Sequence, residues 1–420
     1  MTVRTAVPIL LGWRGGAVGL FVAHLAAAPA VRAQGFDAEF LQSRVEAYRT
    51  GSPSTAAGQP LQAAQTVASF YAARAFEPAW LSPTGRWAPW ADGALALIET
   101  AHRLGLDPGD YHRGALVDLR ARIHAGRASP YDRADAELLL SDAVLHFGSH
   151  LLRGRTDPAR LGPEWTAHRR TAPLEALLAS ALERGRLGAF VEAVAPRHPE
   201  YTRLVDALQR LRDVAAGGGG PFVGEGPSLR PDSSHAGVRD VRARLVASID
   251  PAERAGARAG GLTSPTLDAD LAEAVRSFQR RHGLDDDGVV GRRTRAALGT
   301  PVSDRIAQVE ANLERWRWLP DELGRRHIRV DIPAFTTEFH EAGRPVLSMR
   351  SIVGRPDRPT PSFTARVEYL VLAPWWHVPP TIAALDKLPR IKDDPGYVAA
   401  SHMTLTSAFS DQVVDPFSVD

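Results

Sequence analysis

Apolar residues recur at helical spacing in a compact stretch near the middle of the chain, residues 238–299. Leu271, Val275 and Phe278 are four and three positions apart, so they lie on one face of a helix. An earlier stripe with similar spacing consists of Val238, Val241, Leu245 and Ile249. Another short helix is expected from about 292 to 298. The pattern predicts three short helices that share one core, with a loop rich in glycine and alanine at 250–265.

A tight acidic turn, Asp285-Asp286-Asp287-Gly288, follows the helix end expected at His282-Gly283. Aspartates before a glycine are also found in calcium-binding loops. If Gly288 is aligned with the EF-hand glycine, Gly283 and Thr294 fall at the first and twelfth positions, where the loop needs carboxylates. The spacing therefore argues against calcium, and no metal site is predicted.

The region from 34 to 216 is rich in alanine, leucine and arginine and has helical periodicity. One apolar stripe consists of Leu138, Leu139, Ala143, Phe147 and Leu151. Prolines recur throughout the region and end helices. We therefore predict an all-helical domain of short helices joined by turns, rather than one long coiled coil.

Two groups of side chains in this helical region are candidates for binding. Trp80, Trp87 and Trp90 cluster near one turn, where they are candidates for a sugar-binding groove, but such clusters more often pack in a core. The histidines of the region are His102, His112, His124, His146 and His150. They have no carboxylate at ligand spacing, so we interpret them as surface or hydrogen-bonded residues and not as metal ligands.

The composition changes after the helical domain. Residues 217–237 begin with a glycine run that cannot hold a helix or a central strand, and we interpret them as a linker. A helix is expected at 304–316, with Ile306, Val309 and Leu313 on one face. Strand-like alternation follows at 328–332 and 347–353, and 367–372 is a β-rich run. The chain is predicted to be multidomain α+β, with β structure concentrated in 304–420.

Charge and the N-terminal sequence narrow the possible partners and location. Basic and acidic residues number 50 and 48, which argues against a protein built to neutralise nucleic-acid phosphates. Residues 1–33 contain Arg4 and Arg14, an apolar run at 17–28, and small residues before Gln34. This order predicts an export signal cleaved near Ala33-Gln34. The alternative is an uncleaved anchor, but the run is shorter than the roughly 20 residues that a spanning helix needs.

Most catalytic motifs are absent from the sequence. The segment 226–230 lacks the final glycine of a nucleophile elbow, and His340-Glu341 is not followed by the second histidine of a zinc protease motif. The lysines, Lys387 and Lys392, have no serine three positions before them, which excludes S-x-x-K chemistry. The 420 residues include 0 cysteines, so they contain neither a thiolate nucleophile nor a disulfide.

The pattern F-Q-x-x-H-G-L-x-x-D-G-V-V-G-x-x-T-x-x-x-L at 278–298 resembles the peptidoglycan-binding domain found beside many cell-wall enzymes. Motifs at 215–221, 312–320, 353–361 and 374–380 extend the resemblance to the large exported L,D-transpeptidases of peptidoglycan synthesis. The resemblance implies a helical scaffold domain at 34–216, a small three-helix peptidoglycan-binding domain at 238–299, and the N-terminal part of a β-rich catalytic domain at 304–420.

The resemblance also implies a reaction. In this family a cysteine thiolate, activated by a histidine, transfers an acyl group to form 3→3 cross-links between stem peptides. The family's histidine and cysteine lie well downstream of the W-x-V-P-P segment, and here the chain ends at Asp420 before they appear, so no catalytic residue is assigned. We expect a truncated enzyme, because an incomplete sheet exposes strand edges and apolar surface. The alternative is a non-catalytic peptidoglycan-binding protein.

Site residues and partners follow from the same resemblance. Arg355, Thr360 and Trp376 lie in the shared motifs and are the candidates for substrate binding, and residues 380–394 correspond to the start of a substrate-covering insertion. The expected partners are peptidoglycan stem peptides and glycan strands, with no cofactor. Membrane contact is expected only through the export signal or an uncleaved anchor. The expected location is the periplasm or cell envelope.

Overall fold

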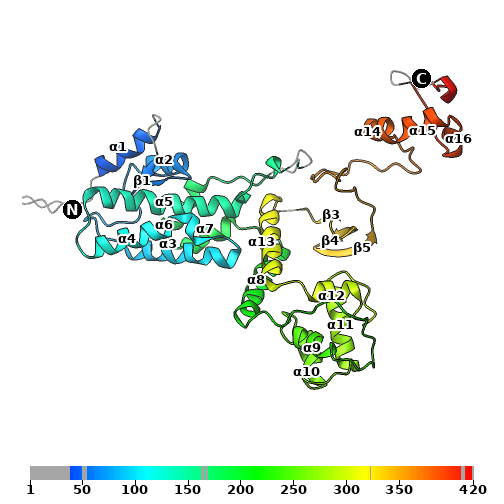
Figure 1. Ribbon diagram of the computed structural model, residues 1–420. Coiled ribbons are helices and arrows are strands. Elements are labelled where there is room, and N and C mark those ends of the chain that lie inside the picture. The colour runs from blue at the N-terminus through cyan, green and yellow to red at the C-terminus, as the bar shows by residue number, and fades with distance from the viewer. Residues whose placement is uncertain are drawn as a thin grey trace, which may run out of the picture. The chain divides into compact units, whose positions relative to one another are not determined.

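The computed structural model describes residues 38–49, 54–161, 165, 169–321, 323–407 and 412–418 (Figure 1). The chain divides into two compact units, residues 1–364 and 365–420, and each is described by itself. The predicted export signal at 1–33 lies outside the described residues. Among the helices of the described part, none is both long enough and apolar enough to cross a bilayer.

The first part of the chain forms the predicted domain of short helices. The helices are α1 (Ala38–Arg49), α2 (Ala64–Ala73), α3 (Pro89–Glu99), α4 (Arg113–His124), α5 (Pro130–Arg153), α6 (Leu174–Glu183), α7 (Leu187–Val194) and α8 (Pro199–Ala216). Short 3-10 helices are η1 (Thr100–Leu104), η2 (Pro108–Tyr111) and η3 (Pro158–Arg160). A small antiparallel hairpin pairs β1 (Thr55–Ala56) with β2 (Gln59–Pro60). The all-helical prediction is confirmed, apart from this hairpin.

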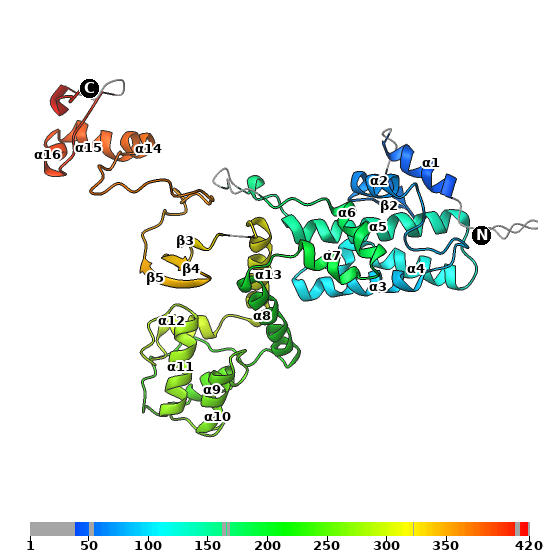
Figure 2. The same cartoon turned by 180° about the vertical axis from the view of Figure 1, so that it is seen from behind.

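Helix α5 forms the centre of the helical domain. It begins with a capping box between Ser129 and Asp132, with Pro130 at its first position. Helices α2, α3, α4, α6 and α7 all pack against it (Figure 2). It is therefore buried on several faces, and the predicted stripe is inside the core: Leu138, Leu139, Ala143, Phe147 and Leu151 are each 0% exposed.

Two carboxylates on α5 are buried in this core and accept backbone N–H groups. Glu137 accepts from the N–H groups of residues 79–81 at 2.6 to 2.9 Å and from the Tyr71 hydroxyl at 2.7 Å. Burial raises the pKa of Glu137, and these donors oppose the rise. Asp142 accepts from the N–H groups of residues 62 and 63 at 3.0 and 2.7 Å, at the start of α2. The two carboxylates thereby fasten two connecting segments to α5.

The tryptophan cluster belongs mainly to the core. Trp80 is fully buried and its indole N–H donates to Ser141 at 2.8 Å, and Trp87 is also buried. Trp90 is 50% exposed, and its indole N–H donates to the Ala79 carbonyl at 2.7 Å. The core interpretation therefore holds for Trp80 and Trp87, whereas Trp90 lies at the surface.

The fold brings a carboxylate to one of the histidines that has none nearby at ligand spacing in the sequence. His112 is buried with its Nε2 2.8 Å from Asp142. His146 and His150 are neighbours on α5, with ring centroids 4.0 Å apart, and His150 Nδ1 lies 2.9 Å from the Tyr111 hydroxyl. Burial, reinforced by nearby positive charges, lowers the pKa of His150 to about 3. His112 and His150 are thus hydrogen-bonded within the domain, and His146 packs against the rings of His150 and Tyr111.

Helix α13 (Val302–Trp318) returns to the helical domain and packs against α8. Leu313 is buried there, and Ile306 and Val309 pack around it, which confirms the helix and the face predicted from the sequence. The repeated Arg-Trp dipeptide of the 312–320 motif, residues 315–318, completes the junction. Arg317 is 1% exposed, donates to the Leu104 carbonyl, and pairs with Glu314 at 3.1 Å. This motif is thus part of the docking surface between α13 and the scaffold.

The residues between α8 and α13 form the small helical module. It contains α9 (Val238–Val246), α10 (Pro251–Ala259), α11 (Ala269–Arg281) and α12 (Arg292–Leu298). The predicted loop at 250–265 is wrong for its first half, because Asp250 caps α10 by accepting from the N–H groups of residues 252 and 253. Gly256 lets α10 approach α11, since a Cβ there would lie 2.7 Å from the Asp270 carbonyl. Ile249 lies in the turn after α9.

The segment expected to be a linker contributes to the module. Val223 and Leu229, within 217–237, are 2% exposed and belong to the same core as Leu271, Val275 and Phe278. Leu229 also pairs with Val290 in an isolated antiparallel bridge. The glycine-rich residues 217–220 are therefore the connection to α8, and the packed module begins at about residue 222.

A three-stranded antiparallel sheet follows α13. Its strands are β3 (Arg326–Asp331), β4 (Thr336–Glu341) and β5 (Arg344–Arg350), in that order. The register shifts at Phe339/His340, opposite Pro345, which has no N–H to donate to the ladder. The strand expected at 328–332 is confirmed as β3, whereas the one expected at 347–353 lies earlier, in β5, and residues 351–353 are outside it. Every residue of β5 is exposed.

The second unit, 365–420, contains short helices. Residues 380–393 form one helical run: α14 (Pro380–Ile382), the π-helical turn η4 (Ala383–Lys387) and α15 (Leu388–Asp393). Pro389 has no N–H to donate, which accounts for the widened turn before it. Helix α16 (Gly396–Ala400) and the 3-10 helix η5 (Pro416–Ser418) follow. The β-rich run at 367–372 is not a strand here, and its exposed apolar side chains have no neighbouring strand in the described sheets.

Candidate functional site

The acidic turn of the small module is held from beneath by a buried glutamine. Gln279 is 1% exposed, and its amide nitrogen donates to Asp287 Oδ1 and the Val289 carbonyl at 3.0 Å and to Thr294 Oγ1 at 3.2 Å. Its amide oxygen accepts the Gly288 N–H at 2.9 Å. Gly288 has a φ of 75°, a left-handed conformation that favours glycine. One side chain therefore fixes both the turn and the start of α12.

A hollow of about 200 Å³ lies over this buried glutamine. Its walls come from the turn and from the first residues of α12, and its lining residues are Gln279, Leu284, Asp285, Asp287, Val289, Gly291, Arg292, Arg293 and Thr294. The base is rigid because Gln279 already satisfies its hydrogen bonds with the surrounding backbone and side chains. Carboxylates and guanidinium groups share the rim. This hollow is the candidate binding site of the module.

The aspartates of the turn already have partners within the protein. Asp286 pairs with Arg280 at 3.3 Å, and Asp285 pairs with Arg293 at 3.5 Å. Asp287 accepts from Gln279 and from the Val289 N–H at 2.8 Å. Their oxygens are directed to different neighbours and do not converge on one point. The geometry fits the sequence argument against a calcium loop.

Arginines with several hydrogen bonds hold the frame of the module together. Arg242 is 0% exposed; it donates to the carbonyls of residues 257 and 266 at 2.8 and 3.1 Å and pairs with Asp268. Arg295 donates to the Pro227 carbonyl at 2.8 and 3.1 Å, which fastens the preceding segment to α12. Arg281 binds both oxygens of the fully buried Glu253 at 2.9 and 2.7 Å. These contacts preorganise the walls of the site.

One further arginine holds the two connections between the module and the helices α8 and α13. Arg244 donates to the carbonyls of Gly219, Leu298 and Thr300 at 2.7, 2.8 and 3.0 Å. Gly219 precedes the module and Thr300 follows it, so a single guanidinium joins both ends. Burial lowers the pKa of Arg244, and Arg281 contributes to the shift.

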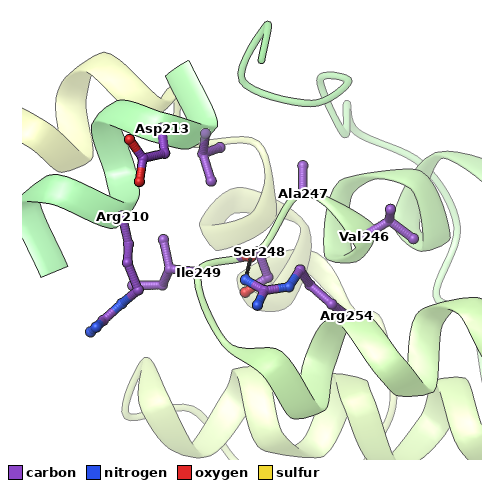
Figure 3. Close-up of a pocket in the computed structure, with 8 residues that line it drawn as sticks. Arg210, Asp213, Val246, Ala247, Ser248, Ile249 and Arg254 are labelled. Atoms are coloured by element: carbon purple, nitrogen blue, oxygen red, sulfur yellow. Dashed lines mark hydrogen bonds between the residues drawn. The ribbon is translucent and has the colours of Figure 1, made fainter. Parts of the chain in front are cut away.

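A second hollow, of about 390 Å³, lies beside this junction (Figure 3). Residues of α8, including Arg210 and Asp213, form one wall, and Ile249 and Arg254 of the module form another. Arg254 donates to the Ser248 carbonyl at 2.9 Å. The shape of this hollow depends on two modules, whereas the smaller hollow is built within one. The smaller hollow is therefore the better preorganised site.

Two of the sequence-predicted substrate residues lie in one closed loop of the first unit. The Thr360 hydroxyl oxygen accepts the Gly354 N–H at 2.7 Å. Arg355 pairs with Asp357 at 3.1 Å, and the Arg358 N–H donates to the Arg355 carbonyl at 2.9 Å. Both ion-pair partners are largely exposed. The loop is stable by its own contacts and presents Arg355 to solvent.

The third predicted residue, Trp376, lies in the second unit and is 63% exposed. The Lys387 ammonium lies 5.8 Å from the Trp376 ring centroid and 5.5 Å from that of Tyr397. Lys387 also donates to the Tyr397 hydroxyl at 3.0 Å, and this hydrogen bond, with one to Ser401, lowers the pKa of Tyr397 to about 8. Lys387 thus orients an aromatic pair that the sequence did not reveal.

Three regions of the chain match known protein families. Residues 65–208 match the scaffold domain, residues 254–298 the "Putative peptidoglycan binding domain", and residues 325–416 the L,D-transpeptidase catalytic domain. These matches confirm the family resemblance and the multidomain α+β class inferred from the sequence. The protein therefore combines regions that are similar to a scaffold domain, a peptidoglycan-binding domain and an L,D-transpeptidase catalytic domain.

A curated relative supports the same assignment. Over 124 residues the chain is 32% identical to the "Putative L,D-transpeptidase" of Haemophilus influenzae. The aligned stretch is 29% of this chain and 25% of the relative, so the match spans about a quarter of that protein's length.

The residues that build the hollow were not identified from the sequence as site residues. Gln279 was visible only as a letter of the peptidoglycan-binding pattern, and Arg292 and Arg293 as polar positions of a short helix. The one sequence feature that these residues share is that they lie within a few positions of the D-G-V-V-G turn. The pattern located the turn, but the convergence of both charges on it required the fold.

Proposed function

We propose that this chain acts in L,D-transpeptidation of peptidoglycan, with the small module holding wall polymer for the catalytic domain. The observation that carries the proposal is the preorganised hollow over Gln279, built from the residues that match a peptidoglycan-binding family. The proposed partners are stem peptides and glycan strands. The reaction of the whole protein would form 3→3 cross-links and contribute to cell wall biogenesis and cell shape.

The proposal divides the labour between the domains. The scaffold and the module are proposed to position the wall polymer, because Arg244 joins the connections that lead from the module to α8 and α13. In the catalytic segment, Arg355, Thr360 and Trp376 are proposed to contact substrate. The thioester chemistry needs a cysteine nucleophile with a positioned base. These 420 residues include 0 cysteines, so their proposed contribution to that step is binding and orientation of the substrate.

The proposed location is the periplasm or cell envelope, reached through the export signal at 1–33 with cleavage near Ala33. The support is the order of charged, apolar and small residues in the sequence together with domains that act on a wall polymer. N-terminal sequencing of the exported protein tests this. A mature product that starts at Met1 would contradict cleavage.

The function is tested with the full chain and purified sacculi. We expect the chain to sediment with sacculi and to form no covalent adduct with a carbapenem, read by intact mass. A chain that stays in the supernatant refutes the binding role. A stable adduct would reveal a nucleophile other than cysteine. Sedimentation without an adduct is also what the second candidate, a non-catalytic peptidoglycan-binding protein, would show. Joining the chain to a relative's downstream histidine and cysteine segment separates the two, because only an enzyme scaffold would then give 3→3 dimers.

A further inference from the structure

The hollow over Gln279 has the size of one amino-acid residue. Its volume of about 200 Å³ is below the roughly 300 Å³ at which pockets for larger organic ligands begin. A disaccharide of the glycan strand exceeds this space. Among the described residues that line the hollow, none is aromatic, so it has no flat surface on which a sugar ring could stack. The site is therefore suited to a peptide group rather than to the glycan.

The rim carries both signs of charge. Asp285 and Asp287 stand on the turn, and Arg292 and Arg293 stand on the first turn of α12. The only cross-rim ion pair in the described structure joins Arg293 and Asp285 at 3.5 Å, with side chains that are 68% and 91% exposed. Such an exposed pair contributes about 0 to 1 kcal/mol. A ligand with its own charges can therefore replace it at little cost.

Arg292 adds an unused donor to this rim. Its side chain is exposed, and within the described part of the chain it has no hydrogen-bond or ion-pair partner. A planar guanidinium binds a carboxylate through two parallel hydrogen bonds. Meanwhile Asp287 is held in place by Gln279 and the Val289 N–H. One side of the hollow is thus ready to accept a carboxylate and the other an ammonium group.

We propose that this hollow binds a zwitterionic amino-acid group, namely the free amine and carboxylate of a diamino dicarboxylic acid residue in a stem peptide. The ammonium group binds Asp285 and Asp287, and the carboxylate binds Arg292 and Arg293. Leu284 and Val289 contact the carbon chain that joins this charged group to the peptide backbone. This inference rests on the proposed peptidoglycan-binding function and names the group that the module recognises. No covalent step is involved.

The test is calorimetric titration of the full chain with a stem peptide that ends in such a residue. Parallel titrations use three other ligands. They are the peptide with the side-chain amine of that residue acetylated, the peptide with the side-chain carboxylate of that residue amidated, and the free diamino diacid. We expect each modification to weaken binding by about tenfold or more, which corresponds to loss of one charged contact. Stronger binding of the peptide than of the free diacid assigns the site to stem peptides, and equal binding assigns it to the free compound.

Variants make the assignment specific to the rim. In Asp285→Asn/Asp287→Asn the penalty for acetylation should disappear, and in Arg292→Gln/Arg293→Gln the penalty for amidation should disappear, because each double change removes both partners of one charge. Arg258→Gln, an exposed arginine of α10 away from the hollow, is the control and should keep both penalties. Circular dichroism confirms that the variants are folded.

The outcomes separate this inference from the proposed function. If modified and unmodified peptides bind equally to the native chain, the zwitterion site is refuted, whatever the variants do. If the chain sediments with sacculi and also with glycan strands stripped of peptides, the binding function stands and the pocket assignment fails. If it sediments with neither, the proposed function itself fails.

Discussion

The scaffold domain and the peptidoglycan-binding module fasten their connecting segments with opposite charges. In the scaffold, Glu137 and Asp142 on the central helix accept backbone N–H groups of residues 79–81 and 62–63. In the module, Arg242, Arg244 and Arg295 donate to backbone carbonyls. Each backbone segment buried without a secondary-structure partner needs a side chain of complementary hydrogen-bonding type.

The difference follows from which backbone groups are left free. Helix α2 has Ala63 at its N-terminal cap, and Ala63 has no side chain able to accept the free N–H groups there. Asp142, from another helix, accepts the N–H groups of residues 62 and 63 directly before the first turn of α2. The module instead has irregular segments whose carbonyls point inward, and an arginine with five donors reaches several of them. The sign of the charge on such a side chain therefore indicates which backbone group lacks a partner: a carboxylate meets free N–H groups, and a guanidinium meets free carbonyls.

Removing the scaffold carboxylate should have the largest effect. Glu137→Ala leaves three backbone N–H groups and the Tyr71 hydroxyl without their acceptor inside a core, so we expect the scaffold to lose about 4 kcal/mol of unfolding free energy. Denaturant unfolding followed by tryptophan fluorescence measures it, since Trp80 lies in this core. Glu77→Ala, an exposed neighbour, is the control. A loss below about 1 kcal/mol would mean that water replaces the carboxylate.

The corresponding change in the module should have a smaller and more local effect. Arg242→Met keeps most of the side-chain volume but removes the donors to two carbonyls and the partner of Asp268, which should cost about 3 kcal/mol. Hydrogen exchange at residues 257–268 should accelerate, while exchange in α5 stays unchanged. Arg258→Met is the matched control. Equal acceleration in the scaffold would show that the two regions are not independent.

Acid should weaken the scaffold through His150. Its pKa is about 3 in the fold, against about 6.5 for a free histidine, so the unfolded chain binds the proton first as the pH falls. Stability therefore decreases from pH 6.5 towards pH 3, by about 2 kcal/mol between pH 7 and 5. His150→Gln should flatten this dependence, and the exposed His124→Gln should not. An unchanged slope in His150→Gln would assign the acid sensitivity to other groups.

The smallest effect is expected where a charge pair is only partly buried. Arg329 pairs with Glu200 of α8 and, at 2.8 Å, with Glu338 of the neighbouring strand. Its surroundings are partly solvated, so Arg329→Gln should lower the unfolding free energy by only about 0.5 kcal/mol. Thermal unfolding in low and high salt measures this. The difference in stability between the native chain and Arg329→Gln should be smaller in high salt, because salt screens the ion pairs. A loss of unfolding free energy as large as that of Arg242→Met would contradict the expectation that fully buried arginines contribute more than partly exposed ones.

Local sequence patterns predicted the helices well, because helical periodicity is a property of neighbouring residues. The faces of α5, α11 and α13 were all identified from spacing alone. Helix α10 was missed because glycine and alanine dominate it, although Asp250-Pro251 followed by Glu253 is a helix-start signal. For 367–372 the β propensity was real, but a strand also needs a partner edge.

The sequence by itself determined the order of the domains, the positions of most of their helices and the family that they resemble. Tertiary structure alone decided that Asp142 meets His112, that Val223 joins the core of the module, and that Gln279 supports a hollow with charges on both sides. The physical reason is distance along the chain. Periodicity acts over a few residues. A buried hydrogen bond instead depends on which distant segment of the chain packs against an unpaired polar group that folding has removed from water.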